Sequence, residues 1–243
     1  MFDGTLAETP PPATELPSEI AELAAGFIHE IKNHLGTLSL NLQLLAEDFE
    51  TPENQRERRA FERITRLSEE CVKLLELSND FLRFARVHEL ILVPTPLGVV
   101  VERMIDFLTP TARQRGIEIN WFAAPNLPLV RLDRDTFAQA LLNLMLNAEQ
   151  AMPDGGTLSL LGRAEADRVC LDVIDTGCGM TAEMIGKIFR PFHTTKKNGT
   201  GLGLPTARKV ILAHGGTIDV LSEPGHGTKV TICLPVGKVE QPA

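Results

Sequence analysis

The 243-residue sequence contains no tyrosine and one tryptophan, so it lacks the aromatic surfaces on which single-stranded nucleic acids stack. Its 24 lysines and arginines are outnumbered by 32 acidic residues, and the net charge of −8 argues against a nucleic-acid partner. No apolar run is long enough to cross a bilayer, and the N-terminus lacks the basic and apolar pattern of a signal peptide. We therefore expect no membrane segment in this chain and a cytoplasmic location.

Cysteine is also scarce, with four residues scattered at Cys71, Cys170, Cys178 and Cys233. None of them has a near neighbour in sequence of the kind that a zinc site needs, and a reducing compartment is the simplest setting. The length leaves room for one large domain or two modest ones. No internal repeat is visible.

The N-terminal third of the chain is typical of two long amphipathic helices. Residues 1–16 are rich in proline and threonine, and we expect a disordered linker there. Beyond Pro17, apolar residues recur at steps of three and four as far as Phe49, where Pro52 ends the helix. The same spacing returns over residues 53–87, from Phe61 to Phe81. The members of the first stripe are Ile20, Leu23, Phe27, Ile31, Leu35, Leu38, Leu42, Leu45 and Phe49.

Two such helices joined by a short turn predict an antiparallel helical hairpin over residues 17–90. Two helices cannot bury both apolar stripes well alone. Pairing two copies into a four-helix bundle solves this, so we expect a homodimer. The alternative is that the stripes pack against the rest of the chain.

From residue 89 onward the pattern changes, and Pro94 and Pro96 predict a hinge. Residues 95–237 then alternate between short apolar strands and helices, which predicts a two-layer α/β sandwich with helices on one face of a largely antiparallel sheet. The expected helices cover residues 98–115, 133–151 and 201–214. The expected strands cover residues 117–122, 129–132, 158–163, 169–174, 217–222 and 229–234.

A histidine stands at the centre of the first helix, in the segment FIHEIKNHLGTL at residues 27–38. His29 is two residues from both Phe27 and Ile31, so a rotation of about 100° per residue turns it roughly 200° from the apolar stripe. With Glu30 beside it and Asn33 one turn on, a second molecule or domain can reach it. Taken alone, an ordinary surface histidine is the simpler interpretation.

Four short motifs in the C-terminal region change that balance. The first is NLMLNA, in which Asn143 and Asn147 share one helical face. Two carboxamides on one face suit Mg²⁺, which prefers oxygen ligands and retains waters. Two exposed asparagines would be an equally good interpretation if this motif stood alone.

The second motif, DTGCGM, begins at Asp175, where a predicted strand ends. Its carboxylate can accept the amino hydrogens of a base, and its glycines let the backbone approach a ligand closely. The third, IFRPFHTTKK from residue 188, combines two phenylalanines with hydroxyls and lysines able to meet phosphate charge. The fourth, GTGLGL from Gly199 to Leu204, leads into a helix whose N-terminal amides form an anion cradle. A dinucleotide-binding loop is disfavoured there, because the motif follows a lysine-rich loop and not a first parallel strand.

Each motif is weak alone, but their order and spacing are together specific. The chain resembles the catalytic core of sensor histidine kinases of two-component systems, whose ATP-binding domain shares its fold with gyrase, heat-shock protein 90 and mismatch-repair ATPases. HEIKN at residues 29–33 looks like the family's phosphoacceptor H box. The four later motifs look like its N, G1, F and G2 boxes. The resemblance extends from about Ile20 to Val236 and is nearest to the nitrogen-regulatory type.

The resemblance implies an ATP- and Mg²⁺-dependent protein-histidine kinase. His29 would be the nucleophile that accepts the γ-phosphoryl group and passes it to an aspartate of a separate response-regulator receiver domain. Glu30 would orient the imidazole. Asn33 matches the position at which the family places a residue that orients water for dephosphorylating the regulator.

The same resemblance assigns the nucleotide site. Asn147 would bind Mg²⁺ with help from Asn143, and Asp175 would read the adenine amino group. The residues expected beside the adenine are Gly177, Gly179 and Thr228. Those expected to face the phosphates are Thr195, Lys196, Gly199, Gly201 and Gly203, followed by Leu204 in the same motif.

Two departures stand out. His34 occupies the place where relatives carry a helix-bending proline, which predicts a straighter helix. His193 replaces a phenylalanine, which predicts a looser lid. Two other functions stay open: a catalytically degenerate dimer that docks a regulator, and a related ATPase or serine kinase. No sensor segment is recognisable before Pro17, and the sequence does not identify the stimulus.

Overall fold

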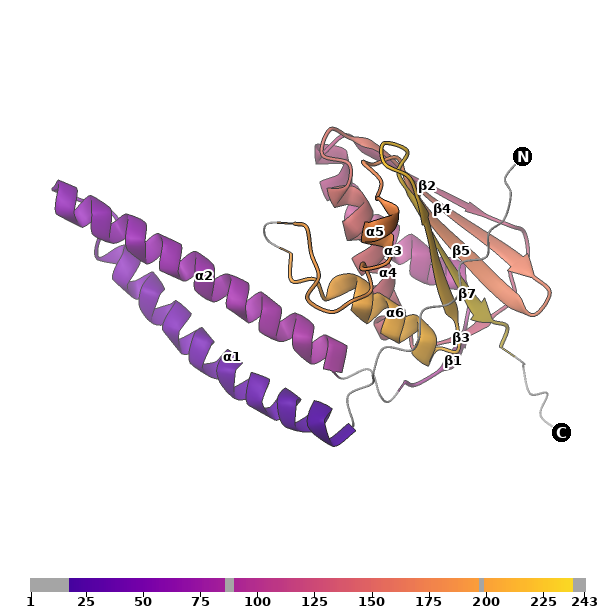
Figure 1. Cartoon of the computed structure of the whole chain (residues 1–243), viewed down its shortest axis with the longest axis horizontal. Helices are drawn as coiled ribbons and strands as arrows, with labels where there is room; N and C mark the ends of the chain where they lie inside the picture. Colours follow the sequence, from indigo (N-terminus) through magenta and orange to yellow (C-terminus); the bar gives the residue numbers. More distant parts are fainter. Residues whose placement is uncertain (1–17, 86–89, 197–198, 238–243) are drawn as a thin grey trace.

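The computed structural model describes residues 18–85, 90–196 and 199–237, with only the backbone described for residues 18–25 and 29. A helical hairpin extends from one side of an α/β unit (Figure 1). The linker expected at residues 1–16 lies outside the described residues. Among those that are described, no helix combines the length and apolar character needed to span a membrane.

The hairpin consists of α1 (Ser18–Glu47) and α2 (Gln55–Ala85), as the apolar spacing predicts. Asn54 caps α2, because its Oδ1 accepts the backbone N–H groups of Arg56 and Glu57 at 3.0 Å each. The two helices bury a stripe against each other that includes Leu42, Ile64 and Cys71. Helix α1 continues without interruption through His34.

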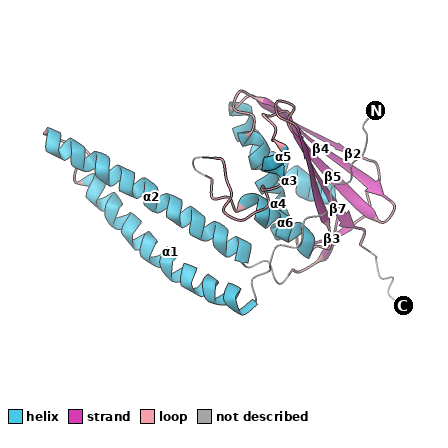
Figure 2. Cartoon of the chain, in the orientation of Figure 1, coloured by secondary structure: helices cyan, strands magenta, loops and turns pink. Residues whose placement is uncertain are grey.

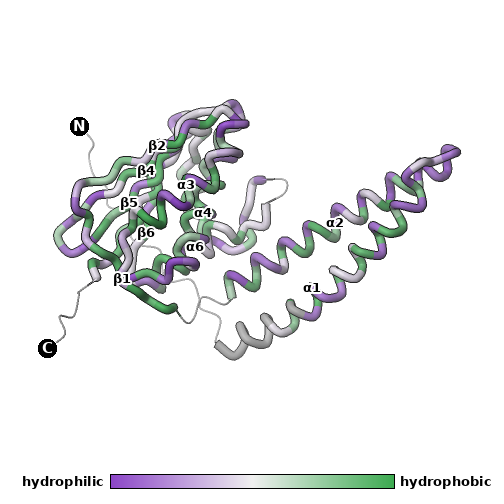
Figure 3. Tube along the Cα trace, turned by 180° about the vertical axis from the view of Figure 1, so that it is seen from behind, coloured by the Kyte–Doolittle hydropathy of each residue, from purple (hydrophilic) through white to green (hydrophobic). Residues whose placement is uncertain are grey.

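Part of the apolar stripe of each hairpin helix stays uncovered in this chain. Hydrophobic residues recur along α2 and along the coloured part of α1 (Figure 3). On α1, Leu38 and Leu45 are exposed, and on α2, Leu67 and Leu74 are exposed. Since these pairs are seven residues apart, each forms a continuous line along its helix.

The α/β unit is a five-stranded sheet with helices on one face (Figure 2). The strand order is β2 (Ile117–Ala123), β4 (Gly156–Glu165), β5 (Arg168–Asp175), β7 (Thr228–Pro235) and β6 (Thr217–Ser222). The β2–β4 pair is parallel, and the other neighbours are antiparallel. Helices α3 (Leu97–Gln114), α4 (Arg134–Gln150) and α6 (Gly203–Ala213) form the second layer. The predicted two-layer sandwich is therefore confirmed.

The core lies between these two layers. Helix α4 contributes Phe137, Leu141 and Met145, all fully buried, and these pack in one cluster with Leu158 and Leu171 of the sheet. Alternate residues of each strand point into this core, which is the period-two pattern of a sheet covered on one face.

Pro94, one of the two prolines at which a hinge is predicted, lies in a strand. Val93–Thr95 form a short strand, β1, paired antiparallel with β3 (Val130–Leu132), in which Pro94 is opposite Arg131. A proline is tolerated there because the strand lies at an edge. The sequence interpretation also missed the four-residue helix α5 (Ala182–Ile185), which Thr181 caps through a hydrogen bond from the Met184 N–H.

The sheet face away from the helices carries a charged cluster around Asp172 and a disulfide. Asp172 is buried there, with Arg163 Nη1 at 2.5 Å, Lys229 Nζ at 2.9 Å and the Thr231 hydroxyl at 2.8 Å. Cys170 and Cys233 are cross-strand partners and form a disulfide. Cysteine spacing did not anticipate this bond, because 63 residues separate the two in sequence.

Candidate functional site

Helix α4 holds the two predicted metal-site asparagines. Its N-terminus is capped by Asp133, whose own N–H donates to Nε2 of the buried His214 at 3.1 Å. Asn143 and Asn147 share the predicted face, and the Asn147 amide donates to the Asn143 carbonyl at 2.8 Å. This bond fixes the amide orientation and leaves Oδ1 of Asn147 directed away from its own helix backbone.

Asp175 ends strand β5 and is buried. Its Oδ1 accepts the N–H of Gly177 at 2.9 Å and that of Thr228, its register partner on β7, at 3.1 Å. Burial raises the pKa of Asp175 against the opposing effect of these two hydrogen bonds. Within the described part of the chain, no hydrogen bond reaches Oδ2, which leaves this oxygen able to accept a bond from a ligand donor.

The glycines beside Asp175 are required by close backbone packing. Gly177 lies against the backbone of Ala151, where a β-carbon would come within 2.6 Å of the carbonyl oxygen. Gly179 has φ of 66° and lies against the Glu223 carbonyl, so a side chain would be both strained and blocked. These contacts fix the loop between β5 and α5.

The start of α6 lies against the asparagines of α4. The Asn143 amide donates to the Gly203 carbonyl at 3.2 Å. A β-carbon added to Gly203 would lie 3.9 Å from both side-chain amides, at ordinary van der Waals distance, so this residue lies directly beside them. Gly201, with φ of 68°, accepts the Phe192 N–H at 3.1 Å and sets the turn into the helix.

Lys196 reaches from the loop before α6 to the same face of α4. Its Nζ lies 2.6 Å from Oδ1 of Asn147 and 2.5 Å from Oε1 of Gln150. Burial lowers the pKa of Lys196. Thr195 and Gly199 are exposed on the same loop. Leu204 packs against the core from the first turn of α6.

The loop and α6 also contact the hairpin, through the C-terminal turns of α2. The Thr200 hydroxyl donates to Asp80 at 2.7 Å, and the rings of Phe81 and Phe192 stack with centroids 6.5 Å apart. Lys209 of α6 donates to the Phe84 carbonyl at 3.0 Å. These contacts attach the α/β unit to the hairpin at one end (Figure 1).

The three predicted residues on α1 are Glu30, Asn33 and His29. Glu30 and Asn33 are exposed, whereas the side chain of His29 lies outside the described residues. Because the helices are antiparallel and Leu42 packs with Ile64 and Cys71, the turn of His29 lies at the height of the C-terminal turns of α2. The α/β unit contacts those same turns.

The donor set of the site suits a nucleotide and a divalent cation. The Asn147 and Gln150 carboxamide oxygens converge on one point, and the cationic Nζ of Lys196 occupies that point as a stand-in ion. Hard oxygen ligands of this kind fit Mg²⁺. The unpaired Asp175 oxygen fits an amino group.

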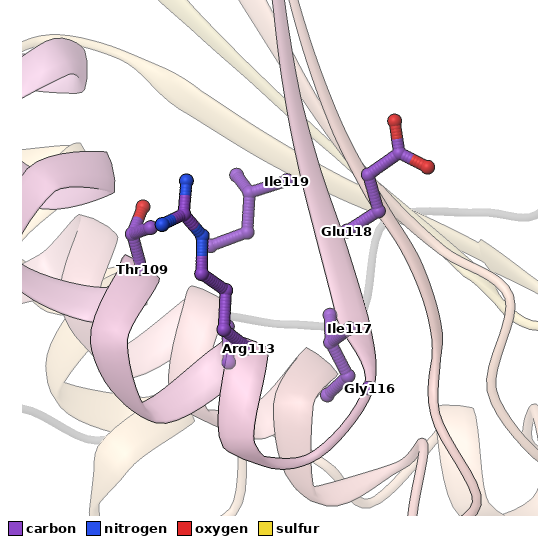
Figure 4. Close-up of a pocket in the computed structure, with 7 residues that line it drawn as sticks. Thr109, Arg113, Gly116, Ile117, Glu118 and Ile119 are labelled. Carbon is purple, nitrogen blue, oxygen red and sulfur yellow. The ribbon is translucent and has the colours of Figure 1, made fainter.

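A hollow of about 410 Å³ lies elsewhere, between the end of α3 and the start of β2. Figure 4 shows Arg113 and Thr109 facing Ile119 across it, while Glu118 points to the other side of the strand. None of the predicted site residues lines this hollow.

Sequence reasoning gave no role to Gln150 and missed the α2 contacts of Asp80 and Phe81. Gln150 had a usable signal, since it follows Asn147 by three residues and therefore shares its face. The α2 residues had none, because their partners are more than a hundred residues away in sequence.

Comparison with known proteins gives a consistent result. Residues 132–238 match the family model described as histidine kinase-, DNA gyrase B- and HSP90-like ATPase. The sensor histidine kinase ZraS of Escherichia coli K12 is 32% identical over 217 residues, which is 89% of this chain and 46% of ZraS. Sporulation kinase E of Bacillus subtilis is 32% identical over 218 residues, 89% of this chain and 29% of that kinase. The chain thus spans less than half the length of these relatives.

Solved structures with a similar fold include those of two further proteins, ShkA and ThkA. The crystal structure of full-length ShkA in complex with AMPPNP superposes with a TM-score of 0.73 at 30% identity, covering 92% of this chain and 47% of that one. The catalytic domain of the histidine kinase ThkA superposes with a TM-score of 0.56 at 28% identity, covering 60% of this chain and 95% of that domain.

Proposed function

Because the chain has the sequence and fold of the catalytic core of sensor histidine kinases, we propose that it uses ATP to phosphorylate its own His29. The phosphoryl group then passes to an aspartate on the receiver domain of a separate response regulator. In this proposal residues 17–90 form the dimerisation and phosphotransfer unit, and residues 95–237 form the ATP-binding unit.

One observation supports this function above the others. Motifs far apart in sequence meet in one site: Asn143 bonds to the start of α6, Lys196 bonds to Asn147, and Asp175 bonds to Thr228. A chain that had lost nucleotide binding would have no reason to keep an open carboxylate oxygen and a set of converging carboxamides together. This favours an active kinase over a degenerate dimer that only docks a regulator.

Within the site, Asp175 accepts the adenine amino group through Oδ2, with Gly177, Gly179 and Thr228 shaping its surroundings. Asn147, aided by Asn143, holds Mg²⁺, which supplies charge neutralisation at the phosphates. The backbone amides at Gly199, Gly201 and Gly203, with Thr195 and Lys196, face the phosphates.

His29 acts as the nucleophile with a neutral ring nitrogen, and Glu30 accepts the proton on the other nitrogen. Phosphoryl transfer has a loose transition state, so the chain contributes mainly position and charge. The α/β unit is attached to α2 at the height of His29, which supports this role, because movement of the unit toward α1 would bring the nucleotide site toward His29. Asn33, one turn after His29, orients water for dephosphorylating the regulator, which gives the protein a second, phosphatase activity.

The exposed stripes of α1 and α2 support a homodimer. Leu38, Leu45, Leu67 and Leu74 are exposed and lie in lines beside the seam of their own hairpin. Joining two hairpins through these lines forms a four-helix bundle and removes the apolar side chains from water.

The test is incubation with γ-labelled ATP and Mg²⁺, followed by acid and base treatment of the protein. We expect acid-labile, base-stable label that is absent from His29→Gln and from Asn147→Ala. Label that persists in His29→Gln but is lost in Asn147→Ala would show that His29 is not the phosphoryl acceptor, while the proposed nucleotide site would still stand. Absence of label in the unmodified chain, with nucleotide still bound, would favour the degenerate dimer.

For the phosphatase activity, Asn33→Ala should keep autophosphorylation and lose dephosphorylation of a phosphorylated receiver domain. An unchanged rate of dephosphorylation in Asn33→Ala would remove that role from Asn33.

A further inference from the structure

The strongest unexplained feature of the site is the position of Lys196. A lysine whose only task is to meet phosphate has no need of a fixed protein partner before the nucleotide arrives. Here its Nζ is held by two oxygens, Oδ1 of Asn147 at 2.6 Å and Oε1 of Gln150 at 2.5 Å. Both residues lie in α4 and share one face, so the two oxygens form a preformed pair.

The orientation of the Asn147 amide supports an oxygen pair directed at a cation. Its Nδ2 donates to the Asn143 carbonyl at 2.8 Å, so its Oδ1 is the atom that faces the loop. In the described residues, no carboxylate pairs with Lys196; its Nζ bonds to two neutral carboxamide oxygens, and the Cys178 thiol interacts with its charge electrostatically. Hard, neutral oxygens of this kind are ligands that a metal ion also prefers.

The loop around Lys196 is built to present its side chain. The Lys196 N–H donates to the Thr194 hydroxyl at 3.1 Å, and the Lys196 carbonyl accepts the Gly199 N–H at 3.3 Å. These two bonds hold the Lys196 backbone in place. The two bonds from its side chain to α4 join the loop to the helix that carries the asparagines.

We propose that Lys196 substitutes for the divalent cation in the nucleotide-free protein, and that Gln150 is a further oxygen ligand which the lysine and the cation share. The ammonium and a metal ion require the same two oxygens, so they exclude each other. Lys196 must leave Asn147 and Gln150 before a cation can bind, and this departure breaks both of its hydrogen bonds to α4. The inference rests on the proposed metal role of Asn147.

Exclusion has a measurable consequence in the absence of nucleotide. If Lys196 holds the oxygens about nine-tenths of the time, the apparent affinity for a cation is reduced about tenfold. The measurement is a titration of the full chain with Mn²⁺ alone. Binding is monitored through the decrease in the electron paramagnetic resonance signal of the free ion. Lys196→Met keeps the length of the side chain and removes the charge, and we expect it to bind Mn²⁺ about tenfold more tightly.

A matched control separates local exclusion from a change in net charge. Lys73 is an exposed lysine of α2, paired with Glu70 at 2.7 Å, and Lys73→Met removes the same charge far from α4. Its Mn²⁺ affinity should equal that of the unmodified chain. Lys196→Gln is a second neutral variant in case Lys196→Met fails to fold, and it should show a gain in the same direction.

The role of Gln150 is tested in Lys196→Met, the variant expected to bind Mn²⁺ most tightly. The double variant Lys196→Met with Gln150→Leu should bind Mn²⁺ less tightly than Lys196→Met, because one of the two oxygen ligands is gone. Equal Mn²⁺ affinity in the double variant and in Lys196→Met would remove Gln150 from the site.

The lysine role is overturned if neither neutral variant binds Mn²⁺ more tightly than the unmodified chain, including the case in which no variant binds it measurably. Failure of the proposed metal site gives a different pattern. If Asn147 is not a metal ligand, the double variant Lys196→Met with Asn147→Ala would bind Mn²⁺ as tightly as Lys196→Met alone. If the double variant loses this tighter binding but the unmodified chain takes no label from γ-labelled ATP, then the metal site is correct and only the proposed kinase activity fails.

Discussion

Asp175 and Thr228 are opposite each other on strands β5 and β7, and the Thr228 N–H donates to Oδ1 of Asp175 at 3.1 Å. This bond, with the one from Gly177, uses one carboxylate oxygen and leaves the other for a ligand. The sheet register therefore decides which oxygen of a buried acid is available.

Asp175→Asn should separate binding from stability. In the folded protein the two backbone N–H groups need an acceptor at Oδ1, so the new amide nitrogen must take the place of Oδ2. A donor would then face the adenine amino group, and we expect AMPPNP affinity to fall by at least tenfold, or about 1.4 kcal/mol. Isothermal titration calorimetry measures this change.

Asp175→Asn should keep or raise the stability of the fold, although it weakens nucleotide binding. Burial raises the pKa of Asp175, so the ionised carboxylate costs stability at neutral pH, and this cost disappears as pH falls through the raised folded-state pKa. Asp175→Asn removes the charge, so its thermal midpoint at pH 7 should equal or exceed that of the unmodified chain. A large loss of stability would show that the carboxylate charge holds the fold.

Asp172 should give the reverse pH dependence. Burial would raise its pKa, but hydrogen bonds from Arg163, Lys229 and Thr231 outweigh burial and lower it. Its stabilising contribution is thus present above its unfolded pKa of about 3.9 and is lost as pH falls through the lower folded value. Asp172→Asn should cost about 1 to 3 kcal/mol at pH 7 by urea unfolding.

The difference between Asp172→Asn and the unmodified chain should shrink as pH falls below about 4. Asp219→Asn, an exposed aspartate of β6 on the same sheet, is the control and should change little at any pH. A difference independent of pH would show that packing and not charge accounts for the effect.

The contact between Phe81 and Phe192 should control how closely the α/β unit is held to the hairpin. Phe81→Ala removes the larger apolar part of this contact and leaves the Thr200–Asp80 hydrogen bond. We expect a larger radius of gyration by small-angle X-ray scattering with unchanged AMPPNP affinity. Phe107→Ala, at an exposed site on α3, should leave the scattering curve as it is. An unaltered curve for Phe81→Ala would mean that the stack does not hold the units together.

Leu74→Arg should prevent dimerisation. Leu74 is exposed in the single chain and would be buried in the proposed bundle, where an unpaired arginine costs several kcal/mol. Sedimentation velocity should show a monomer, while Leu221→Arg, on the exposed face of β6, should stay dimeric. A dimeric Leu74→Arg would place the interface elsewhere.

The disulfide predicts a defined count of thiols. Cys71 is buried and Cys178 is exposed, and both are free. Without reductant, Ellman's reagent should detect one thiol in the native protein and two after denaturation, rising to four after reduction. The Cys170–Cys233 bond closes a 63-residue loop, so replacing both residues with valine should cost about 4 kcal/mol in the chain-entropy model. Four thiols in unreduced, denatured protein would show that the bond does not form in solution.

Local patterns in the sequence determined the elements and most of their bounds. Both hairpin helices, the three helices of the α/β unit and the five strands of its sheet follow from apolar spacing and from the proline and glycine signals between them. Spacing within one helix likewise put Asn143 and Asn147 on one face. These features depend only on backbone periodicity, which a few neighbouring residues fix.

Tertiary structure decided the features that join distant segments. Pro94 belongs to a strand because β3 lies beside it, and Cys170 meets Cys233 because β5 pairs with β7 in one register. Lys196 holds Asn147 and Gln150 across 49 and 46 residues of sequence. Such contacts are set by how whole elements pack, and local periodicity carries no information about that packing. The sequence therefore determined the parts of the site, and the packed fold determined which atoms face one another.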